Sequence, residues 1–434
     1  MKKNINIAVV GLGQIGIYLL NELNTKRKDI ELKTGKKIKV TAISARNINK
    51  KRRFKINKKI FYKNPLAILK DTKIDILFEA IGLSDGMSKR IVEESLKKKI
   101  HVITPNKALM AKHGDYLAKL AENNKVNLEF EASVAGGIPI LRTIKEGLAT
   151  NKIHKVFGIL NGTCNYILSE MENSKDSFTN VLKRAQKLGY AEPSNPKFDL
   201  NGHDALAKVR ILSSLSFNTK ISHKKCLLEG IENIELKDIE ITNQLNFRIK
   251  LLGITELINN QLFERVHPCL VNANSYIGNI DGVLNATIIN SLPVGQSIMQ
   301  GKGAGPGPTT SSLMSDLYSL LRENIKYPFI TSYKLRKKIS HFNYLNYSYS
   351  CYLRFEVKDK PGVLSSITKY LALNKISVRR LLQIPDKKKR SASIIIITHR
   401  TSEKRITACL RKLKNKEYLI KSPTFIRVGE INDN

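Results

Sequence analysis

A glycine pattern directly after a short apolar segment constrains the fold of this chain more than any other sequence feature. Residues 5–10 are apolar apart from Asn6, as in a parallel strand covered on both faces, and Gly11, Gly13 and Gly16 follow. The first glycine permits a tight turn, the second lets the backbone approach a pyrophosphate, and the third allows a helix to pack closely on the strand. The pattern predicts a dinucleotide site with Gln14 and Ile15 at the anion-attracting helix N-terminus; a plain glycine turn is the alternative.

The rest of the chain predicts three domains, because 434 residues exceed what one core usually supports. Further strand-like segments at 38–44, 74–81 and 101–104 alternate with helix-like segments, which is typical of a doubly wound parallel sheet. We expect this nucleotide-binding domain over 1–132 and an α+β domain over 133–325, whose end near 300–325 returns to the first domain. A basic linker over 326–349 and a small α+β domain over 350–428 complete the prediction.

The charge balance suggests a different function. The 74 Lys+Arg against 37 Asp+Glu give a net charge of +37. Such a charge is typical of proteins that bind nucleic acid, and residues 50–59 would be the basic patch. Such a partner requires basic residues on one face with aromatic residues among them, whereas the lysines here occur in every segment. We therefore expect no nucleic-acid partner. No apolar run approaches the length of a membrane span, and the five scattered cysteines form no disulfide or zinc pattern, so we expect a cytoplasmic protein without a membrane partner.

The end of the second predicted strand bears on the choice of cofactor. NAD sites usually place a carboxylate there for the ribose 2′-hydroxyl, but this segment has Ser44 and Arg46 and no acid. These side chains can donate hydrogen bonds to a 2′-phosphate, and Lys50 can assist. The segment favours NADP, with NAD as the alternative. For Arg46, a solvated arginine at a strand end is the alternative.

A second group of polar residues lies between 185 and 212. Glu192, Asp199, Asp204 and Lys208 flank a turn that enters a predicted helix. Asp204 and Lys208 are four residues apart, so they share one helix face within pairing distance. A capping acid with a surface lysine is the structural alternative.

Together these motifs resemble the monofunctional homoserine dehydrogenases that carry a C-terminal ACT domain. The resemblance rests on AVVGLGQIG, TPNKALMAKHG, FEASVAGGIPI, GILNGTCNYIL, the segment 185–208, EGIENIELKDI, VHPCLV and GKGAGPGPT, which together span nearly the whole chain. It implies an α/β Rossmann-type sheet, an α+β catalytic and dimerisation domain, and a ferredoxin-like ACT domain. A related Rossmann oxidoreductase acting on another small amino-acid aldehyde is the nearest enzyme alternative.

The resemblance also implies the reaction and its residues. Such enzymes transfer a hydride reversibly between L-homoserine and L-aspartate 4-semialdehyde, in threonine, methionine and isoleucine biosynthesis. Lys208 would be the acid/base at the substrate oxygen, with Lys107 beside it and Asp204 orienting it. Glu192 would bind the substrate ammonium, and Asp199 would also contact the substrate. Burial and a second cation both lower the pKa of a lysine, which suits Lys208 to this role.

Other family features map onto this chain. Thr104, Lys107 and Gly303 would contact the cofactor. The Glu131 side chain and the carbonyls of Val134, Gly136 and Ile138 would hold a monovalent cation, sodium, since oxygen ligands suit a hard cation; a glycine turn without a metal is the alternative.

The C-terminal domain implies regulation. Asp359 to Val363 open a helix as in ACT domains, with threonine as the implied effector, although the basic segment 379–393 departs from the family pattern. A domain retained only for dimerisation is the alternative. We expect a homodimer or homotetramer.

Overall fold

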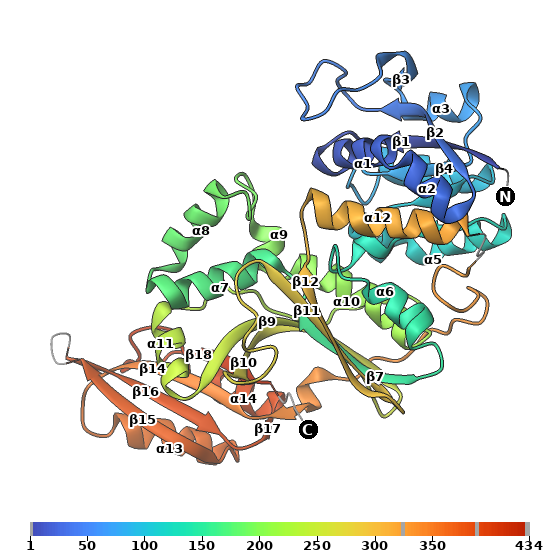
Figure 1. The fold of residues 1–434 in the computed structure, drawn as a ribbon. Coiled ribbons are helices and arrows are strands. Elements are labelled where there is room, and N and C mark those ends of the chain that lie inside the picture. Colours follow the sequence, from blue (N-terminus) through green and yellow to red (C-terminus); the bar gives the residue numbers. More distant parts are fainter. Residues whose placement is uncertain (1–2, 323–325, 387–389, 430–434) are drawn as a thin grey trace.

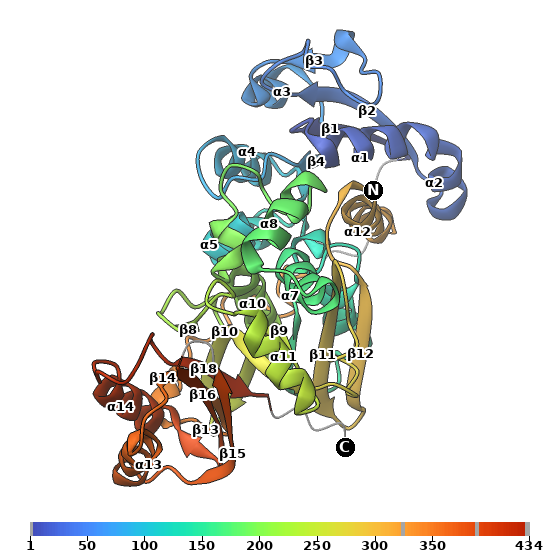
Figure 2. The same ribbon diagram turned by 90° about the vertical axis from the view of Figure 1, so that its left-hand side faces the viewer.

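The protein consists of three regions arranged in sequence order along its length. The structure, a computed structural model, describes residues 3–322, 326–386 and 390–429. The N-terminal sheet lies at the top of Figure 1, the middle region below it, and the C-terminal region at the lower left; Figure 2 shows the same order from the side.

The N-terminal region is a six-stranded parallel sheet in the order β3-β2-β1-β4-β5-β6. Its strands are β1 (Asn4–Val10), β2 (Lys37–Ser44), β3 (Phe61–Tyr62), β4 (Ile76–Glu79), β5 (His101–Ile103) and β6 (Leu128–Glu129). Its helices are α1 (Gln14–Thr25), α2 (Arg27–Thr34), η1 (Lys58–Ile60), α3 (Pro65–Asp71), α4 (Met87–Lys97) and α5 (Lys107–Asn123). This strand order confirms the predicted doubly wound sheet.

Both faces of β1 are covered, which explains its largely apolar sequence. Ile5, Ile7 and Val9 belong to one apolar core with residues of α1, whereas Ala8 and Val10 belong to a second core with residues of α4 and α5. The alternation follows from the two-residue period of a strand. Ligands of such sheets bind at the carboxyl ends of the strands, where the site residues described below lie.

The middle region contains a mixed sheet with helices packed against it. Its strands are β7 (Lys152–Ile159), β8 (Leu227–Leu228), β9 (Phe247–Ile258), β10 (Gln261–Asn272), β11 (Leu284–Leu292) and β12 (Gly295–Lys302). Its helices are η2 (Glu131–Ser133), α6 (Ile140–Arg142), η3 (Thr143–Gly147), α7 (Gly162–Ser174), α8 (Phe178–Lys187), α9 (Lys197–Leu200), α10 (His203–Ser216), α11 (Leu236–Gln244) and α12 (Pro306–Leu321). Figure 1 shows α12 back beside α1, and its apolar residues complete the core of that face of the N-terminal sheet.

The C-terminal region has the βαββαβ order of a ferredoxin-like domain. It comprises β14 (Cys351–Lys358), α13 (Val363–Leu373), β15 (Val378–Asp386), β16 (Ser391–Thr398), α14 (Glu403–Leu413) and β18 (Thr424–Val428), with η4 (Tyr344–Asn346), β13 (Ser348–Tyr349) and β17 (Thr401–Ser402) at its border. Strand β18 pairs with β10, so the sheets of the middle and C-terminal regions are continuous. The C-terminal domain is thus joined to the middle region through backbone hydrogen bonds.

The predicted linker 326–349 is anchored to its neighbours. Arg336 is fully buried and pairs with Asp115 at 2.7 Å, and the backbone of Leu262 donates to the carbonyl of Ser340. The segment packs against these neighbours because its cationic side chains form ion pairs with carboxylates on other elements. The boundary that we expected at 325 lies outside the described residues.

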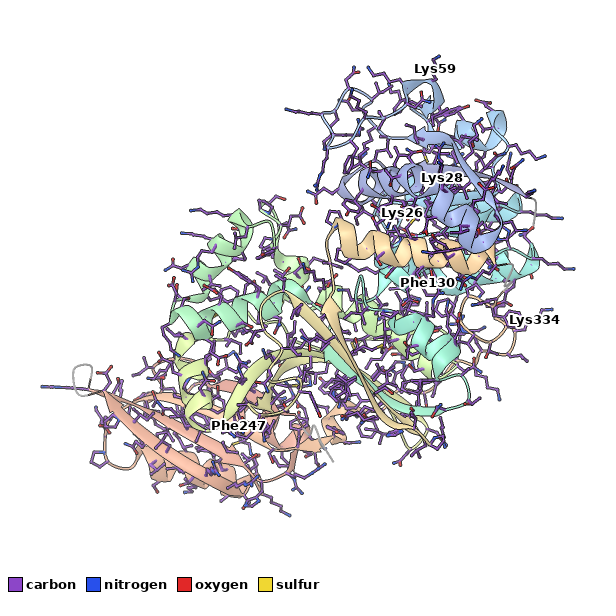
Figure 3. All side chains as sticks on the ribbon, in the orientation of Figure 1. Lys26, Lys28, Lys59, Phe130, Phe247 and Lys334 are labelled. Carbon is purple, nitrogen blue, oxygen red and sulfur yellow. The ribbon has the colours of Figure 1, made fainter. Side chains whose placement is uncertain are left out.

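Two surface properties complete the description. Within 3–322, 326–386 and 390–429, no helix is long and apolar enough to cross a bilayer. Figure 3 labels Lys28 in α2, Lys59 in η1, Lys26 between α1 and α2, and Lys334 in the segment after α12.

Candidate active site

The glycine loop between β1 and α1 has the geometry of a pyrophosphate cradle. A Cβ at Gly11, which has a φ of +94°, would lie 2.4 Å from the carbonyl oxygen of Ala80, and one at Gly16 would lie 1.8 Å from the carbonyl oxygen of Gly11. A Cβ at Gly13 would meet no atom within 4 Å, so this side of the loop is open. Gly13 caps α1 without a side-chain hydrogen bond, which leaves the backbone N–H groups of Gln14 and Ile15 for phosphate oxygens. These residues therefore fit a dinucleotide.

Basic residues follow the end of β2. Arg46 is exposed two residues beyond Ser44, whose own side chain is buried and whose carbonyl accepts from the N–H of Gly11 at 2.9 Å. Arg52, which the sequence did not single out, donates to the carbonyls of Leu12, Asn47, Ile48 and Lys50. It thereby fixes the basic segment that carries Arg46 and Lys50 against the glycine loop.

A buried polar network holds the ends of β4 and β5. Glu79, with no exposed surface, accepts hydrogen bonds from the hydroxyls of Thr104 at 2.6 Å and Ser88 at 2.7 Å. Asn106 donates to the Ser88 hydroxyl and caps α5 by accepting from the N–H of Leu109. Because Lys107 is the first residue of α5, this network fixes the position from which its side chain extends.

Lys107 crosses from the N-terminal region to meet an acid and a lysine of the middle region. Its Nζ lies 2.5 Å from one carboxylate oxygen of Asp204, and the Nζ of Lys208 lies 2.8 Å from the other. Lys208 also donates to the carbonyl of Leu160 at 2.5 Å. The predicted pairing of Asp204 with Lys208 on one face of α10 is present, and both side chains are more than nine-tenths buried. Lys107 remains 38% exposed, on the open side of the cluster.

Asn161 joins the two acids of the cluster. Its amide donates to Asp199 at 2.9 Å and to Asp204 at 2.8 Å, while its carbonyl oxygen accepts from the N–H of Cys164 and caps α7. The prediction assigned no role to this residue. An asparagine before glycine at the start of an apolar periodic segment is a capping signal, and its place in GILNGTCN indicated a polar group at this end of α7.

The two lysines have opposite electrostatic environments. Burial lowers the pKa of Lys208, and the cation of Lys107 lowers it further, although Asp204 opposes both effects. Asp204 raises the pKa of the more open Lys107, which therefore stays protonated. Burial alone would raise the pKa of Asp204, but the two ammonium groups outweigh it and the pKa is lowered. A permanent cation and a lysine that loses its proton more readily thus share one carboxylate.

Asp199 behaves differently from Asp204. Burial, followed by the nearby charge of Asp204, raises its pKa.

Glu192 lies outside the cluster. It is exposed on the segment between α8 and α9, and within the described residues its carboxylate contacts only the hydroxyl of Ser194, at 3.3 Å. Gly303 follows β12 and lies against Gly136, because a Cβ at Gly136 would stand 2.3 Å from its carbonyl oxygen.

The side chain of Glu131, an expected cation ligand, is buried and accepts two backbone hydrogen bonds. Phe130, labelled in Figure 3 where the N-terminal and middle regions meet, precedes this buried glutamate. The Glu131 carboxylate accepts from the backbone N–H groups of Leu141 at 2.9 Å and Arg142 at 2.7 Å, so it serves as a cap for α6. Burial raises its pKa to about 6, so the group is still mainly a carboxylate at neutral pH and keeps lone pairs for a cation.

The carbonyl oxygens of the same turn remain available to a cation. Gly136 accepts from the Ser312 hydroxyl and Ile138 from the N–H of Ile140, but a carbonyl oxygen has a second lone pair. The expected ligand set, the Glu131 side chain with the backbone carbonyls of Val134, Gly136 and Ile138, therefore stays a prediction.

A dinucleotide cradle beside a buried lysine and carboxylate cluster defines a nicotinamide-nucleotide-dependent oxidoreductase. Residues 11–131 match the family model described as "Homoserine dehydrogenase, NAD binding domain", residues 139–318 match "Homoserine dehydrogenase", and residues 352–417 match "ACT domain". The chain belongs to the homoserine dehydrogenase family, so it is an NAD(P)-dependent oxidoreductase with a C-terminal ACT domain.

Individual relatives agree along the whole chain. It is 35% identical to the homoserine dehydrogenase of Neisseria gonorrhoeae and 36% identical to that of Helicobacter pylori, in both cases over 99% of this chain and 100% of the relative. The solved structure of a homoserine dehydrogenase from Thiobacillus denitrificans superposes with a TM-score of 0.89 at 33% identity, over 98% of both chains. The predicted family, activity and fold class are confirmed.

Proposed function

We propose that Lys208 is the acid/base of homoserine oxidation, that Lys107 and Asp204 complete the catalytic group, and that NADP is the preferred cofactor. The observation that carries the proposal is the single carboxylate of Asp204 held between two lysines with oppositely shifted pKa values. A base of this kind must be neutral near the working pH, whereas a group that stabilises an alkoxide must stay charged.

Each residue of the cluster then has a separate role in the reaction. In homoserine oxidation, neutral Lys208 accepts the proton of the substrate hydroxyl, and Lys107 stabilises the negative charge that develops on that oxygen. The bound nicotinamide supplies the hydride acceptor. Asp204 holds both ammonium groups in place, and Asn161 keeps Asp204 and Asp199 at a fixed separation. In the reverse direction, protonated Lys208 returns the proton to the carbonyl oxygen.

Substrate recognition is proposed for Asp199 and Glu192. Asp199 is next to the cluster and partly buried, so its carboxylate suits a polar group of the amino acid. Glu192, on its exposed segment, would bind the substrate ammonium, and closing this segment over the substrate would bring it there.

Exposed Arg46 supports the preference for NADP and gives its test. Arg46→Asp places a carboxylate where a 2′-phosphate would lie, so the ratio of kcat/KM with NADP to that with NAD should fall by about a hundredfold, or roughly 3 kcal/mol. Homoserine-dependent reduction of each cofactor measures this ratio. Arg405→Asp, an equal charge change at an exposed site on α14, is the control. An unchanged ratio in Arg46→Asp would remove this residue from the phosphate site.

The ACT domain is proposed to bind threonine as an inhibitor. Gly362, with a φ of +85°, opens α13 next to the exposed residues Asp359 and Lys360, so backbone N–H groups are accessible there. L-Threonine should lower the rate of homoserine oxidation by several-fold, consistent with coupling energies of about 1–3 kcal/mol, and D-threonine should not. Equal rates with and without L-threonine would show that the domain does not sense it.

The remaining proposals concern the cation and the assembly. A sodium ion would bind the side chain of Glu131 and the carbonyls of Val134, Gly136 and Ile138. A homodimer or homotetramer is supported by exposed apolar residues at the edge of the middle sheet, where Leu292 is 61% and Val294 57% exposed. A cytoplasmic location is supported by five unpaired cysteines, which a reducing compartment maintains.

A further inference from the structure

A short segment, residues 228–231, holds the turn that connects the two acids of the site. Asp199 lies in α9 and Asp204 lies in α10, and the turn 200–202 comprises the last residue of α9 and the two residues before α10. The N–H of Ile231 donates to the carbonyl of Leu200 at 2.9 Å. A Cβ at Gly230 would lie only 2.1 Å from the same oxygen, so backbone packs directly on backbone. Any movement of this segment therefore moves the turn.

Gly202, at the other end of the turn, lies close to the same segment and to β10. Gly202 has a φ of +85° and opens α10, and a Cβ there would lie 3.0 Å from Leu228 and from Val266. The N–H of Glu229 donates to the carbonyl of Val266 at 2.8 Å, which ties the segment to β10. The turn that separates Asp199 from Asp204 is thus enclosed by residues 228–231 and β10.

The side chain of Glu229 is held by the C-terminal domain. Arg427 of β18 binds its carboxylate through both terminal nitrogens, at 2.6 and 2.7 Å. Arg427 is only 2% exposed, and its other contacts are Glu403, at 2.7 and 3.0 Å, and the hydroxyl of Tyr349. The planar guanidinium of Arg427 binds the Glu229 carboxylate bidentately and is itself anchored by Glu403. This arrangement fixes the orientation of the Glu229 carboxylate as well as its distance from Arg427.

We propose that Glu229 is a positioning residue for Asp199 and Asp204, and that Arg427 sets its position from the C-terminal domain. The inference rests on the proposed function of the acid and lysine cluster. The contacts run from Arg427 to Glu229, from residues 229–231 to Leu200, and from Leu200 to the acids on either side of the turn. The C-terminal domain would thus contribute to catalysis even without an effector.

Other ion pairs across the same domain boundary offer a matched comparison. Lys421 pairs with Glu235 at 2.6 Å, but both side chains are at least 40% exposed. Glu235 caps the start of α11 and, among the described contacts, none joins it to the turn 200–202. Loss of this pair weakens the domain contact without moving the acids, so Lys421→Ala serves as the control.

The test compares Glu229→Gln, Arg427→Met, the double variant and Lys421→Ala in the full-length enzyme. We expect kcat for homoserine oxidation to fall about tenfold in Glu229→Gln, because small displacements of catalytic groups cost one to two orders of magnitude. KM for homoserine should rise, and KM for NADP should stay unchanged. Since both residues act through one contact, the double variant should lose no more activity than the more impaired single variant. Lys421→Ala should behave like the unmodified enzyme.

The outcomes separate this proposal from the proposed function. Normal kinetics in folded Glu229→Gln, or losses that multiply in the double variant, would overturn the positioning role while Lys208 keeps its own. A lower melting temperature with unchanged kcat would show a purely structural contact and also overturn it. Arg427→Met leaves Glu403 without its partner. If that variant fails to fold, Glu229→Gln alone still tests the positioning role. An unmodified enzyme inactive with homoserine would contradict the proposed function instead.

Discussion

Replacing Lys208 by methionine should lower kcat for homoserine oxidation by about a thousandfold, within the range that positioned proton-transfer groups contribute. Methionine fills a similar volume, so the buried site keeps its packing. The variant lacks the group that accepts the substrate proton, and Lys107 cannot replace it because Asp204 raises the pKa of Lys107. Steady-state assays with homoserine and NADP measure the loss.

The same variant should still bind NADPH. The cradle residues Gly11, Gly13 and Gly16 belong to the N-terminal region, whereas Lys208 lies in α10 of the middle region. Titration of NADPH fluorescence should therefore give an unchanged dissociation constant. Lys187→Met, at an exposed position of α8, is the control for the substitution itself. Activity of Lys208→Met within tenfold of the unmodified enzyme would remove this lysine from the mechanism.

Most of the fold could be predicted because its signals are local. The apolar run over 5–10 and the glycines after it specify a strand, a turn and a helix within one short segment, and each glycine has the close contact or the open space expected of it. The fusion of the C-terminal sheet to β10 could not be predicted, because pairing between Cys269 and Arg427 joins residues far apart in sequence and depends on the packing of whole domains.

The site was predictable only in part, for a related reason. Asp204 and Lys208 share a helix, so their spacing alone predicts the pair, but Lys107 reaches Asp204 from another domain and was placed there only by resemblance. The hydrogen bonds from the N–H groups of Leu141 and Arg142 to the Glu131 carboxylate were not predicted, because the sequence does not show which helix end faces a buried acid. The role of Asn161 was not predicted, because a helix-capping asparagine has the same sequence signal whether or not its amide also donates to carboxylates such as Asp199 and Asp204.

Asp204→Asn should lower both activity and stability, because two cations lose their shared counter-charge. Removing one partner of a buried ion pair costs about 3 kcal/mol or more, since the remaining charge is left without compensation. Lys107 can turn toward solvent, but Lys208 is buried and cannot. We expect kcat to fall by at least a hundredfold, as for loss of a group that orients an acid/base. Asp71→Asn, at an exposed position at the end of α3, is the control.

The pH dependence of this variant distinguishes an electrostatic role from simple loss of structure. Asp204 opposes the lowering of the Lys208 pKa, so its removal should lower that pKa further. Homoserine oxidation requires neutral Lys208, and the rate therefore rises with pH through this pKa; in Asp204→Asn the rise should occur at lower pH. A profile that keeps its midpoint while the rate falls would contradict the assignment of this limb to Lys208.

Stability should show a matching pH dependence. The folded-state pKa of Asp204 lies below its ordinary value, so its charge stabilises the fold fully above that value, about 4, and the contribution is lost as pH falls toward the lowered pKa. The difference in melting temperature between the unmodified enzyme and Asp204→Asn should therefore be largest near neutral pH and shrink below pH 4, at about the ordinary carboxyl pKa. A difference that is constant down to the acid range would show that the charge of Asp204 does not hold the two lysines.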